Sequence, residues 1–418
     1  MHRKKCILFC GNGMSSEILK DLKDEYRLLM ISEFKNDVGL NYLDDFIYAD
    51  SKNPEAALEA AKQFKANGYD FDAVLSLCWD SSVSVARIAH YFNLIGISEN
   101  VAIDASNKAI RSGIFEKNNI AAPKYRQVNS LQELKIAVKE IVYPIVLKPL
   151  ELSSSKGVIR VNEPNELYTA YQYCMKYIKD KESSLIVNEF IKGTEYSLEG
   201  LMINNKLHTT GISQRVFHYE KYKPNFVESG DILPAGISEK LSIECSRITE
   251  SAAAALGIEN SVVKADLIIT DDNRIFIFEL TPRLGGPRFG TEMIPLHNGT
   301  NILKAAIKQA LGEEVDLNDL KPKFNKGVVN RSIFPEPGII NSIEGLDKIK
   351  TLPGYYDYKW WGIEPLEIGS EIKNPENGCG GVGYLIITGE DRETAIKNAD
   401  LIEGKLVIKT KKGAVTIG

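Results

Sequence analysis

The chain has 418 residues and a formal net charge of −5, which suits a large protein of two to four domains, each with its own core. Its 51 Lys and Arg and 56 Asp and Glu residues are mixed along the chain, which argues against a nucleic acid as the main partner. Apolar runs such as 141–147 are far shorter than the roughly 20 residues of a membrane-spanning helix, so no membrane partner is expected.

The N-terminal segment predicts a strand from residue 6 to 10, a glycine turn at Gly11-Asn12-Gly13 and the start of a helix. Because this turn lacks the third glycine of the dinucleotide-binding fingerprint, a nicotinamide-dependent oxidoreductase is only an alternative. A strand over 71–78 and an amphipathic helix over 82–92 follow, and repeated strand and helix units favour a parallel sheet. The six cysteines lack metal-ligand spacing and indicate reduced thiols of a cytoplasmic protein.

The next informative element is a short apolar strand over 143–149 that carries Lys148 near its end. A buried strand rarely holds a lysine without a partner for its charge, so Lys148 is expected to meet an anion. The small-residue turn 152–161 comes next, and the N–H groups and hydroxyls of such a turn can surround phosphate oxygens. A serine-rich segment is more often a plain loop, and this one gains weight from Lys148 before it and Lys156 within it.

Residues 185–191 predict another strand, and the loop 192–200 that follows offers backbone donors and acceptors for the edge of a base. In this loop, Glu195 could accept hydrogen bonds from ribose hydroxyls. Further along, residues 214–236 combine aromatic side chains with charges of both signs and are too irregular for a core element. Such mixtures often line binding sites, so we expect this stretch to border one.

Two apolar strands, 261–270 and 274–281, flank the turn signal Asp271-Asp272-Asn273 and indicate a hairpin. This pairing places Asp266 beside Glu279, while Glu279, Thr281 and Arg283 alternate on one face. Two carboxylates and a hydroxyl suit Mg²⁺, which is usually shared with substrate phosphates. For this spacing alone, an edge-strand glutamate with a surface arginine partner is the alternative.

The order and spacing of these segments resemble the ATP-grasp superfamily over about residues 1–320. The resemblance implies that Lys108 and Lys148 bind phosphates and that Arg283 lies near the transferred phosphate or the acyl group. It implies an ATP site made of a phosphate-covering loop, Ser153, Ser154, Ser155, Lys156, Gly157 and Val158, an adenine hinge, Glu189, Phe190 and Ile191, and Glu195 at the ribose. It also implies two Mg²⁺ ions, which Mn²⁺ can replace, on Asp266, Glu279 and Thr281. The family more often has Glu at the position of Asp266 and Asn at the position of Thr281.

Residues 226–235 resemble the corresponding part of L-amino acid ligases, which implies that Glu228 lies near the metal or the amine; a surface carboxylate is the alternative. After Arg283, Gly285 and Gly286 let the backbone approach a ligand closely, and Arg283 or Arg288 would clamp a carboxylate. The implied activity is that of an ATP-dependent carboxylate–amine ligase that forms a dipeptide-like amide through an acyl phosphate. Its implied partners are small-molecule carboxylate and amine substrates, with amino acids favoured, and a homodimer is the family's habit. Residues 79–81 would help to wall the acceptor site, with a plain loop as the alternative for each of them.

The implied fold class is α/β and α+β multidomain. It has a Rossmann-like N-terminal domain over 1–100, ATP-grasp subdomains over 101–184 and 185–320, and a β-rich C-terminal domain over 321–418. A polar connector is expected over 320–335, and one helix over 392–403. Two other functions stay open, namely an ATP-grasp enzyme that activates bicarbonate or formate, and a non-catalytic ATP-binding module, which the departure at Thr281 allows.

Overall fold

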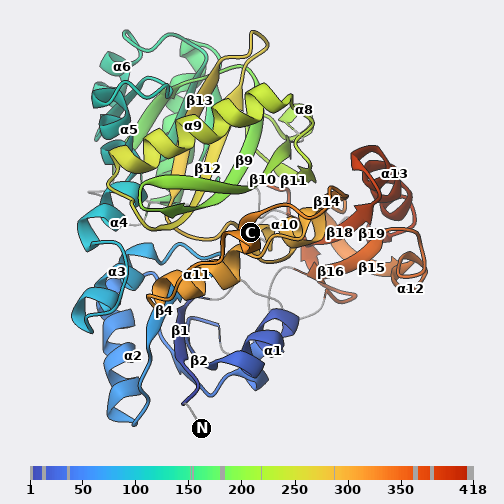
Figure 1. Ribbon diagram of the computed structural model, residues 1–418. Helices are drawn as coiled ribbons and strands as arrows, with labels where there is room; N and C mark the ends of the chain where they lie inside the picture. The colour runs from blue at the N-terminus through green and yellow to red at the C-terminus, as the bar shows by residue number, and fades with distance from the viewer. Residues whose placement is uncertain are drawn as a thin grey trace.

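A computed structural model describes residues 3–11, 16–34, 38–150, 152, 155–178, 184–217, 219–286, 288–360, 366–376 and 381–411. Figure 1 shows the N-terminal part of the chain at the bottom, two sheets and their helices above it, and the C-terminal part at the right. Ser153, Ser154 and Gly13, which the sequence placed at sites, lie outside the described residues.

The N-terminal part forms a parallel four-stranded sheet, as the strand and helix pattern predicts. Its strands, in spatial order, are β3 (Asp45–Tyr48), β2 (Arg27–Ser32), β1 (Cys6–Cys10) and β4 (Ala73–Ser76). Helices α2 (Pro54–Ala66) and α3 (Ser82–Tyr91) pack against one face. Helix α1 (Ser16–Glu25) packs against the other, where α11 (Ile302–Ala310) joins it from much later in the chain (Figure 1).

Helices α4 (Glu99–Ser106) and α5 (Lys108–Lys117) lead into a second, antiparallel sheet. Its strands are β5 (Tyr125–Val128), β8 (Leu185–Glu189), β6 (Ile145–Pro149) and β7 (Ile159–Val161), with α6 (Leu131–Ala137) and α7 (Leu167–Tyr177) packed against it. Because β8 pairs with both β5 and β6, the predicted boundary at residue 184 cuts through this sheet. The first subdomain therefore extends to Glu189.

The largest sheet has eight antiparallel strands. In spatial order they are β13 (Ile275–Thr281), β12 (Ser261–Ile269), β9 (Thr194–Ile203), β10 (Lys206–Phe217), β11 (Glu228–Leu233), β14 (Gly327–Ile333), β18 (Gly383–Gly389) and β16 (Tyr355–Trp360). Helix α9 (Glu239–Ala255) lies across one face of its first strands (Figure 1). Three segments predicted to be irregular contain strands, namely much of 192–200, part of 214–236 and residues 327–333 of the predicted connector. Polar residues alternate with apolar ones in these strands, which makes them hard to recognise in the sequence.

The C-terminal part continues this sheet, so the predicted boundary at residue 321 separates strands of one layer. A small sheet of β17 (Glu371–Ile372), β15 (Gly338–Glu344) and β19 (Val407–Lys411) completes it, with the short helix α12 (Leu346–Ile349). The predicted helix over 392–403 is confirmed as α13 (Arg392–Glu403), which buries Ala395, Ala399 and Ile402.

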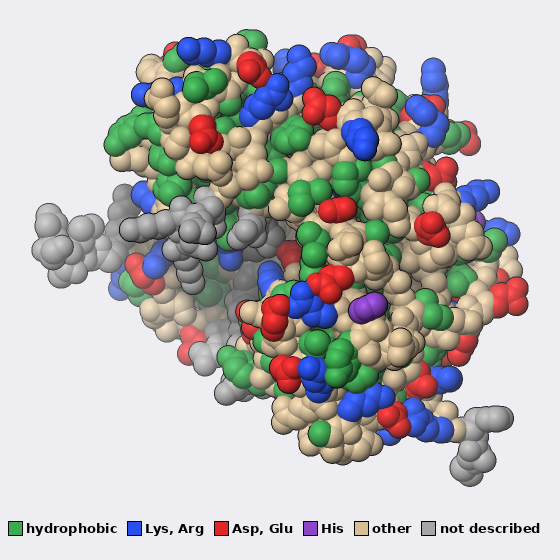
Figure 2. Space-filling view, turned by 90° about the vertical axis from the view of Figure 1, so that its left-hand side faces the viewer, with side chains coloured by type: hydrophobic (Ala, Val, Ile, Leu, Met, Phe, Trp, Pro, Cys, Tyr) green, Lys and Arg blue, Asp and Glu red, His purple; other side chains and the backbone are tan. Residues whose placement is uncertain are grey.

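The remaining short helical segments are α8 (Tyr219–Tyr222), α10 (Ile294–Asn298), a π-helical turn (Phe289–Met293) and three 3₁₀ turns (Val38–Tyr42, Pro164–Glu166, Leu317–Leu320). Among the described residues, every helix is too short or too polar to cross a membrane. The five cysteines in those ranges are free thiols. On the face seen in Figure 2, basic and acidic side chains are interspersed, as the mixed charges of the sequence predict.

Candidate active site

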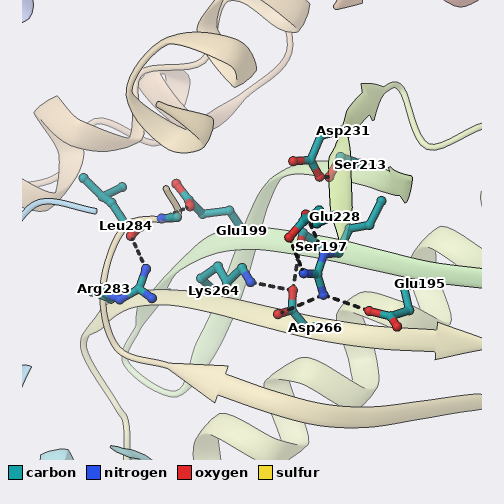
Figure 3. Close-up of polar contacts among 12 residues, drawn as sticks. Glu195, Ser197, Glu199, Ser213, Glu228, Asp231, Lys264, Asp266, Arg283 and Leu284 are labelled. Carbon is teal, nitrogen blue, oxygen red and sulfur yellow. Dashed lines mark hydrogen bonds and ion pairs between the residues drawn. The ribbon is translucent and has the colours of Figure 1, made fainter. Parts of the chain in front are cut away.

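One face of the large sheet is lined with polar side chains from five adjacent strands. They are Glu195, Ser197 and Glu199 on β9, Ser213 and Arg215 on β10, Glu228 and Asp231 on β11, Lys264 and Asp266 on β12, and Glu279 and Thr281 on β13. Figure 3 shows most of these groups directed toward one another above the strands. The opposite face is apolar and packs against α9. Because successive side chains of a strand point to opposite faces, each strand contributes both to this core and to the polar face, which we call the polar wall.

Two lysines lie at one end of a pocket between this wall and the second sheet. Lys108 begins α5, and its Nζ donates to the backbone oxygens of Leu150 and Leu152 at 2.8 and 2.6 Å. Lys148, on β6, has neither a hydrogen bond nor an ion pair with any residue in the described ranges. Burial, together with the nearby ammonium of Lys108, lowers the pKa of Lys148 to about 8. A buried ammonium group that has no hydrogen bond or ion pair among the described residues is suited to bind an anionic ligand.

The predicted phosphate loop lies beside these lysines. Ser155 has a φ of 56° and Gly157 a φ of 71°, so the chain turns sharply here. Ser155 and Val158 line the pocket, whereas Lys156 is exposed. The turn at the described end of the loop therefore borders the pocket, while the charged side chain of Lys156 is exposed to solvent.

Apolar side chains line another part of the pocket. The end of β8 brings Glu189, Phe190 and Ile191 to its edge, and the guanidinium of Arg160 lies 4.0 Å from the centre of the Phe190 ring. Its further apolar lining consists of Val146, Phe217, Phe226, Ile268 and Phe278. A slot lined in this way suits a flat, weakly polar group such as a base.

Arg215 joins the carboxylates of three strands. Its guanidinium donates to both carboxylate oxygens of Glu228 at 3.0 and 2.7 Å and to Glu195 at 2.9 Å, and it lies 3.5 Å from Asp266. Burial raises the pKa of Glu195 to about 7, although Arg215 acts in the opposite direction. Burial also disfavours ionisation of Asp266, but Arg215 and Lys264 more than compensate, and its pKa stays below the ordinary range. The fork of an arginine can satisfy several carboxylates at once, which a lysine cannot do.

Asp266 and Glu279 are Cα partners in the β12–β13 hairpin, as the turn signal predicts. Burial disfavours ionisation of Glu279, but the neighbouring Arg111 lowers its pKa below the ordinary value. Glu279 has no hydrogen bond or ion pair within the described part of the chain, and the buried Thr281 Oγ1 has no hydrogen-bond partner there. No group of three His, Cys, Asp or Glu side chains suited to a metal occurs among the described residues. Mg²⁺ needs only one or two carboxylates when phosphates complete its shell, so this donor set fits such an ion.

Arg283 lies at the far end of the wall, where the large sheet meets the N-terminal sheet. Its Nε and Nη2 donate to Asp80 Oδ1 at 2.8 and 2.5 Å, and Nη1 donates to the Leu284 oxygen at 2.9 Å. Asp80 follows β4, so the N-terminal part of the chain fixes the direction of this guanidinium. Residues 79–81 were predicted to wall the acceptor site, and the contact of Asp80 with Arg283 is compatible with that role.

Arg288 does not share this location and is not available as a clamp for a carboxylate. It is buried and ion-paired with Glu292 and, at 2.7 Å, with Asp357.

Gly285 and Gly286 were expected to let the backbone approach a ligand, but both contact other groups of the protein. A Cβ at Gly285 would lie 2.7 Å from Glu199 Oε2, and one at Gly286 would lie 3.2 Å from the Cys78 oxygen. These glycines let the loop pack against Glu199 and Cys78.

Gly11 bears on the alternative of a dinucleotide site. A Cβ at Gly11 would lie 2.5 Å from Cδ1 of Trp79, so the indole ring covers the face of the glycine that a pyrophosphate would approach. In addition, Trp79 Nε1 donates to Glu33 at 2.9 Å, which holds the ring in place. The geometry therefore disfavours nicotinamide binding here.

Among the site residues missed from the sequence are Arg111, Glu199, Arg215 and Lys264. Arg111 is buried, donates to the Ala105 oxygen at 2.6 Å and has an Nε without a hydrogen-bond partner in the described ranges. A signal existed for the other three. Each lies two or four residues from a predicted site residue or from another polar residue of the same strand, and this alternation identifies their common face.

Residues 141–291 match the family described as an ATP-grasp domain, and residues 331–411 match the family described as L-amino acid ligase C-terminal domain 2. The uncharacterized protein y4rH of Sinorhizobium fredii is 24% identical over 329 residues, which cover 78% of this chain and 66% of that protein. The D-alanine–D-alanine ligase of Campylobacter concisus is 26% identical over 264 residues, which cover 60% of this chain and 73% of that protein.

A solved structure, the L-amino acid ligase from Bacillus licheniformis, has a TM-score of 0.83 with this chain at 20% identity. The likeness covers 98% of this chain and 99% of that one, and it shows a shared fold. The chain spans slightly less than two thirds of the length of y4rH.

Proposed function

We infer that this chain, which belongs to the ATP-grasp superfamily, is an ATP-dependent ligase that joins a carboxylate to an amine and releases ADP and phosphate. The observation that carries this proposal is the meeting of Lys108, Lys148 and Glu279 around one pocket, with Asp266 beside Glu279 as its partner in the hairpin, although two different sheets and a helix supply them. Cations beside carboxylates able to hold Mg²⁺ are what a triphosphate requires.

ATP is proposed to bind with its base in the apolar slot at Glu189, Phe190 and Ile191, and with its ribose at Glu195. Its phosphates would extend toward Lys108 and Lys148 under the loop that contains Ser153, Ser154, Ser155, Lys156, Gly157 and Val158. Lys148 would lose the cost of its buried charge when a phosphate becomes its partner. The loop would exclude water during the reaction.

Magnesium is proposed to bind Glu279 and Asp266, with Thr281 as a further oxygen donor, and Mn²⁺ is expected to substitute. The ion would supply charge neutralisation at the phosphates. The resemblance in sequence implies two such ions. Because Thr281 Oγ1 is buried without a partner in the described residues, it can bind an ion without breaking another hydrogen bond.

The acid substrate is proposed to lie beside Arg283, whose direction Asp80 fixes. A carboxylate oxygen held there would attack the γ-phosphorus, and the ADP oxygen would leave as the acyl phosphate forms. An amine would then displace phosphate and give the amide. Holding the two reactants together can supply about 7–11 kcal/mol toward the barrier. Glu228 is paired with Arg215, which lines the nucleotide pocket, so its proposed role near the amine would act through that pair.

Amino acids are the proposed substrates, and the C-terminal domain that matches L-amino acid ligases supports them. The free cysteines support a reducing compartment such as the cytoplasm. A homodimer stays a prediction from the resemblance.

A screen of acid and amine pairs for the release of ADP and phosphate, followed by mass spectrometry of the product, tests this proposal. Amino-acid pairs should give ADP, phosphate and a product of dipeptide mass in equal amounts. ADP release with bicarbonate or formate, and with no amino acid, would support the alternative acid instead. ATP binding without turnover of any pair would favour a non-catalytic module.

A further inference from the structure

The carboxylate of Asp266 is already surrounded by donors. Its Oδ1 accepts hydrogen bonds from Lys264 Nζ at 2.5 Å and from Ser197 Oγ at 2.6 Å. Its Oδ2 lies 3.5 Å from Arg215 Nη1. Oδ1 therefore uses its two lone pairs on protein donors, while Oδ2 faces only the guanidinium. Two cationic side chains of the protein thus already neutralise Asp266 (Figure 3).

Lys264 occupies a defined place on the polar wall. On β12, it is two residues before Asp266, and its Cα partners are Thr281 on β13 and Glu199 on β9. Its side chain is 15% exposed, and its Nζ reaches Asp266. The side chain thus extends from the position beside Thr281 to the carboxylate of Asp266. A second cation shared by Asp266 and Thr281 would have to lie in this same space.

The carboxylate of Glu279, unlike that of Asp266, has no protein donor within hydrogen-bond distance among the described residues. It borders the pocket and has neither a hydrogen bond nor an ion pair in the described part of the chain. Its carboxylate can therefore coordinate an ion with both oxygens. The two carboxylates of the wall are thus unequal, because Glu279 has no ion pair among the described residues and Asp266 already has two cationic side chains beside it.

We propose that the ammonium group of Lys264 takes the place of a second metal cation, so that the chain binds one divalent ion with its nucleotide and not two. This rests on the proposed function, because it concerns the same nucleotide site. An ammonium group neutralises Asp266 and donates hydrogen bonds, but it cannot bind a metal. A second dication placed beside Lys264 and Arg215 would meet charges of its own sign in a poorly solvated site.

The test counts Mn²⁺ ions bound per chain of the full-length protein. Free Mn²⁺ is measured by electron paramagnetic resonance during titration, with and without a saturating non-hydrolysable ATP analogue. One bound ion per chain that depends on the analogue is expected. Two such ions would overturn this inference and leave the proposed function standing, whereas none would contradict both. The count on the unaltered chain decides the matter even where a variant fails to fold.

Variants of Lys264 test whether this lysine determines the number of bound Mn²⁺ ions. Lys264→Met removes the ammonium and should raise the number of bound ions from one to two, while Lys264→Arg keeps the charge and should leave one. Lys304→Met, which removes a surface lysine of α11, is the matched control and should also leave one. In addition, free Mg²⁺ beyond that complexed with ATP should activate Lys264→Met and not the unaltered chain. One bound ion in Lys264→Met would show that Lys264 does not determine the number.

Discussion

Replacement of Glu199 by Gln should reduce the fall in the free energy of unfolding between pH 5 and 7. Glu199 is fully buried on β9, where its Oε2 accepts a hydrogen bond from the Gly285 amide at 2.5 Å. Its Oε1 has no hydrogen-bond partner among the described residues. Burial raises the pKa of Glu199 to about 8, from an ordinary value of 4.5.

The sign and size of the effect follow from proton linkage. Because the pKa is raised in the folded state, the folded protein keeps a proton that the unfolded chain releases, and stability falls as the pH rises from 4.5 toward 8. These two pKa values give a loss of about 2–3 kcal/mol between pH 5 and 7 from this group alone. Glutamine has no such proton and keeps a carbonyl oxygen for the Gly285 amide, so the variant should lack this loss.

The assay is urea unfolding of both proteins at pH 5, 6 and 7, followed by the same fluorescence transition. The free energy of unfolding should fall less with pH in Glu199→Gln than in the unaltered chain. Glu390→Gln, which changes a glutamate with an 87% exposed side chain, is the control and should keep the full slope. The same slope in Glu199→Gln as in the unaltered chain would refute the reasoning, since Glu199 would then be ionised when folded.

Three further predictions concern Lys148, Arg215 and Asp80. Lys148→Met should slow ADP release by at least about 100-fold without lowering the unfolding midpoint, because a buried cation without a described partner is lost; normal turnover would count against its phosphate role. Arg215→Met should destabilise the fold by about 3–5 kcal/mol at pH 8 and by less at pH 6, where Glu195 takes up a proton. Equal losses in urea unfolding at both pH values would contradict this. Asp80→Asn should raise the KM for the acid about 10-fold and leave the KM for ATP unchanged, because it releases Arg283. Steady-state kinetics with each substrate varied measure both constants, and parallel changes would refute the assignment.

Local sequence signals predicted those parts of the site that depend on one strand or one turn. The turn at residues 271–273 was sufficient to pair Asp266 with Glu279, because a hairpin fixes register over a short distance. Lys148 stood out because a charge within an apolar strand needs an explanation. The helix over 392–403 could likewise be predicted from its own residues.

Contacts between distant strands could not be predicted in this way. The partners of Arg215 are on β9, β11 and β12, and their proximity depends on the order of strands in the sheet. The same limitation explains the boundary at residue 184, because the pairing of β8 with β5 is a long-range contact. For Arg288, the partner Glu292 lies only four residues further on, but the burial of the pair and the second partner, Asp357 on β16, 69 residues away, depend on distant packing.

The most direct test of the account is a crystal structure of the protein with Mg²⁺ and a non-hydrolysable ATP analogue. The account predicts Nζ atoms of Lys108 and Lys148 within hydrogen-bond distance of phosphate oxygens, and an ion that joins Glu279 to the same phosphates. A nucleotide bound elsewhere, or phosphates that contact neither lysine, would contradict it.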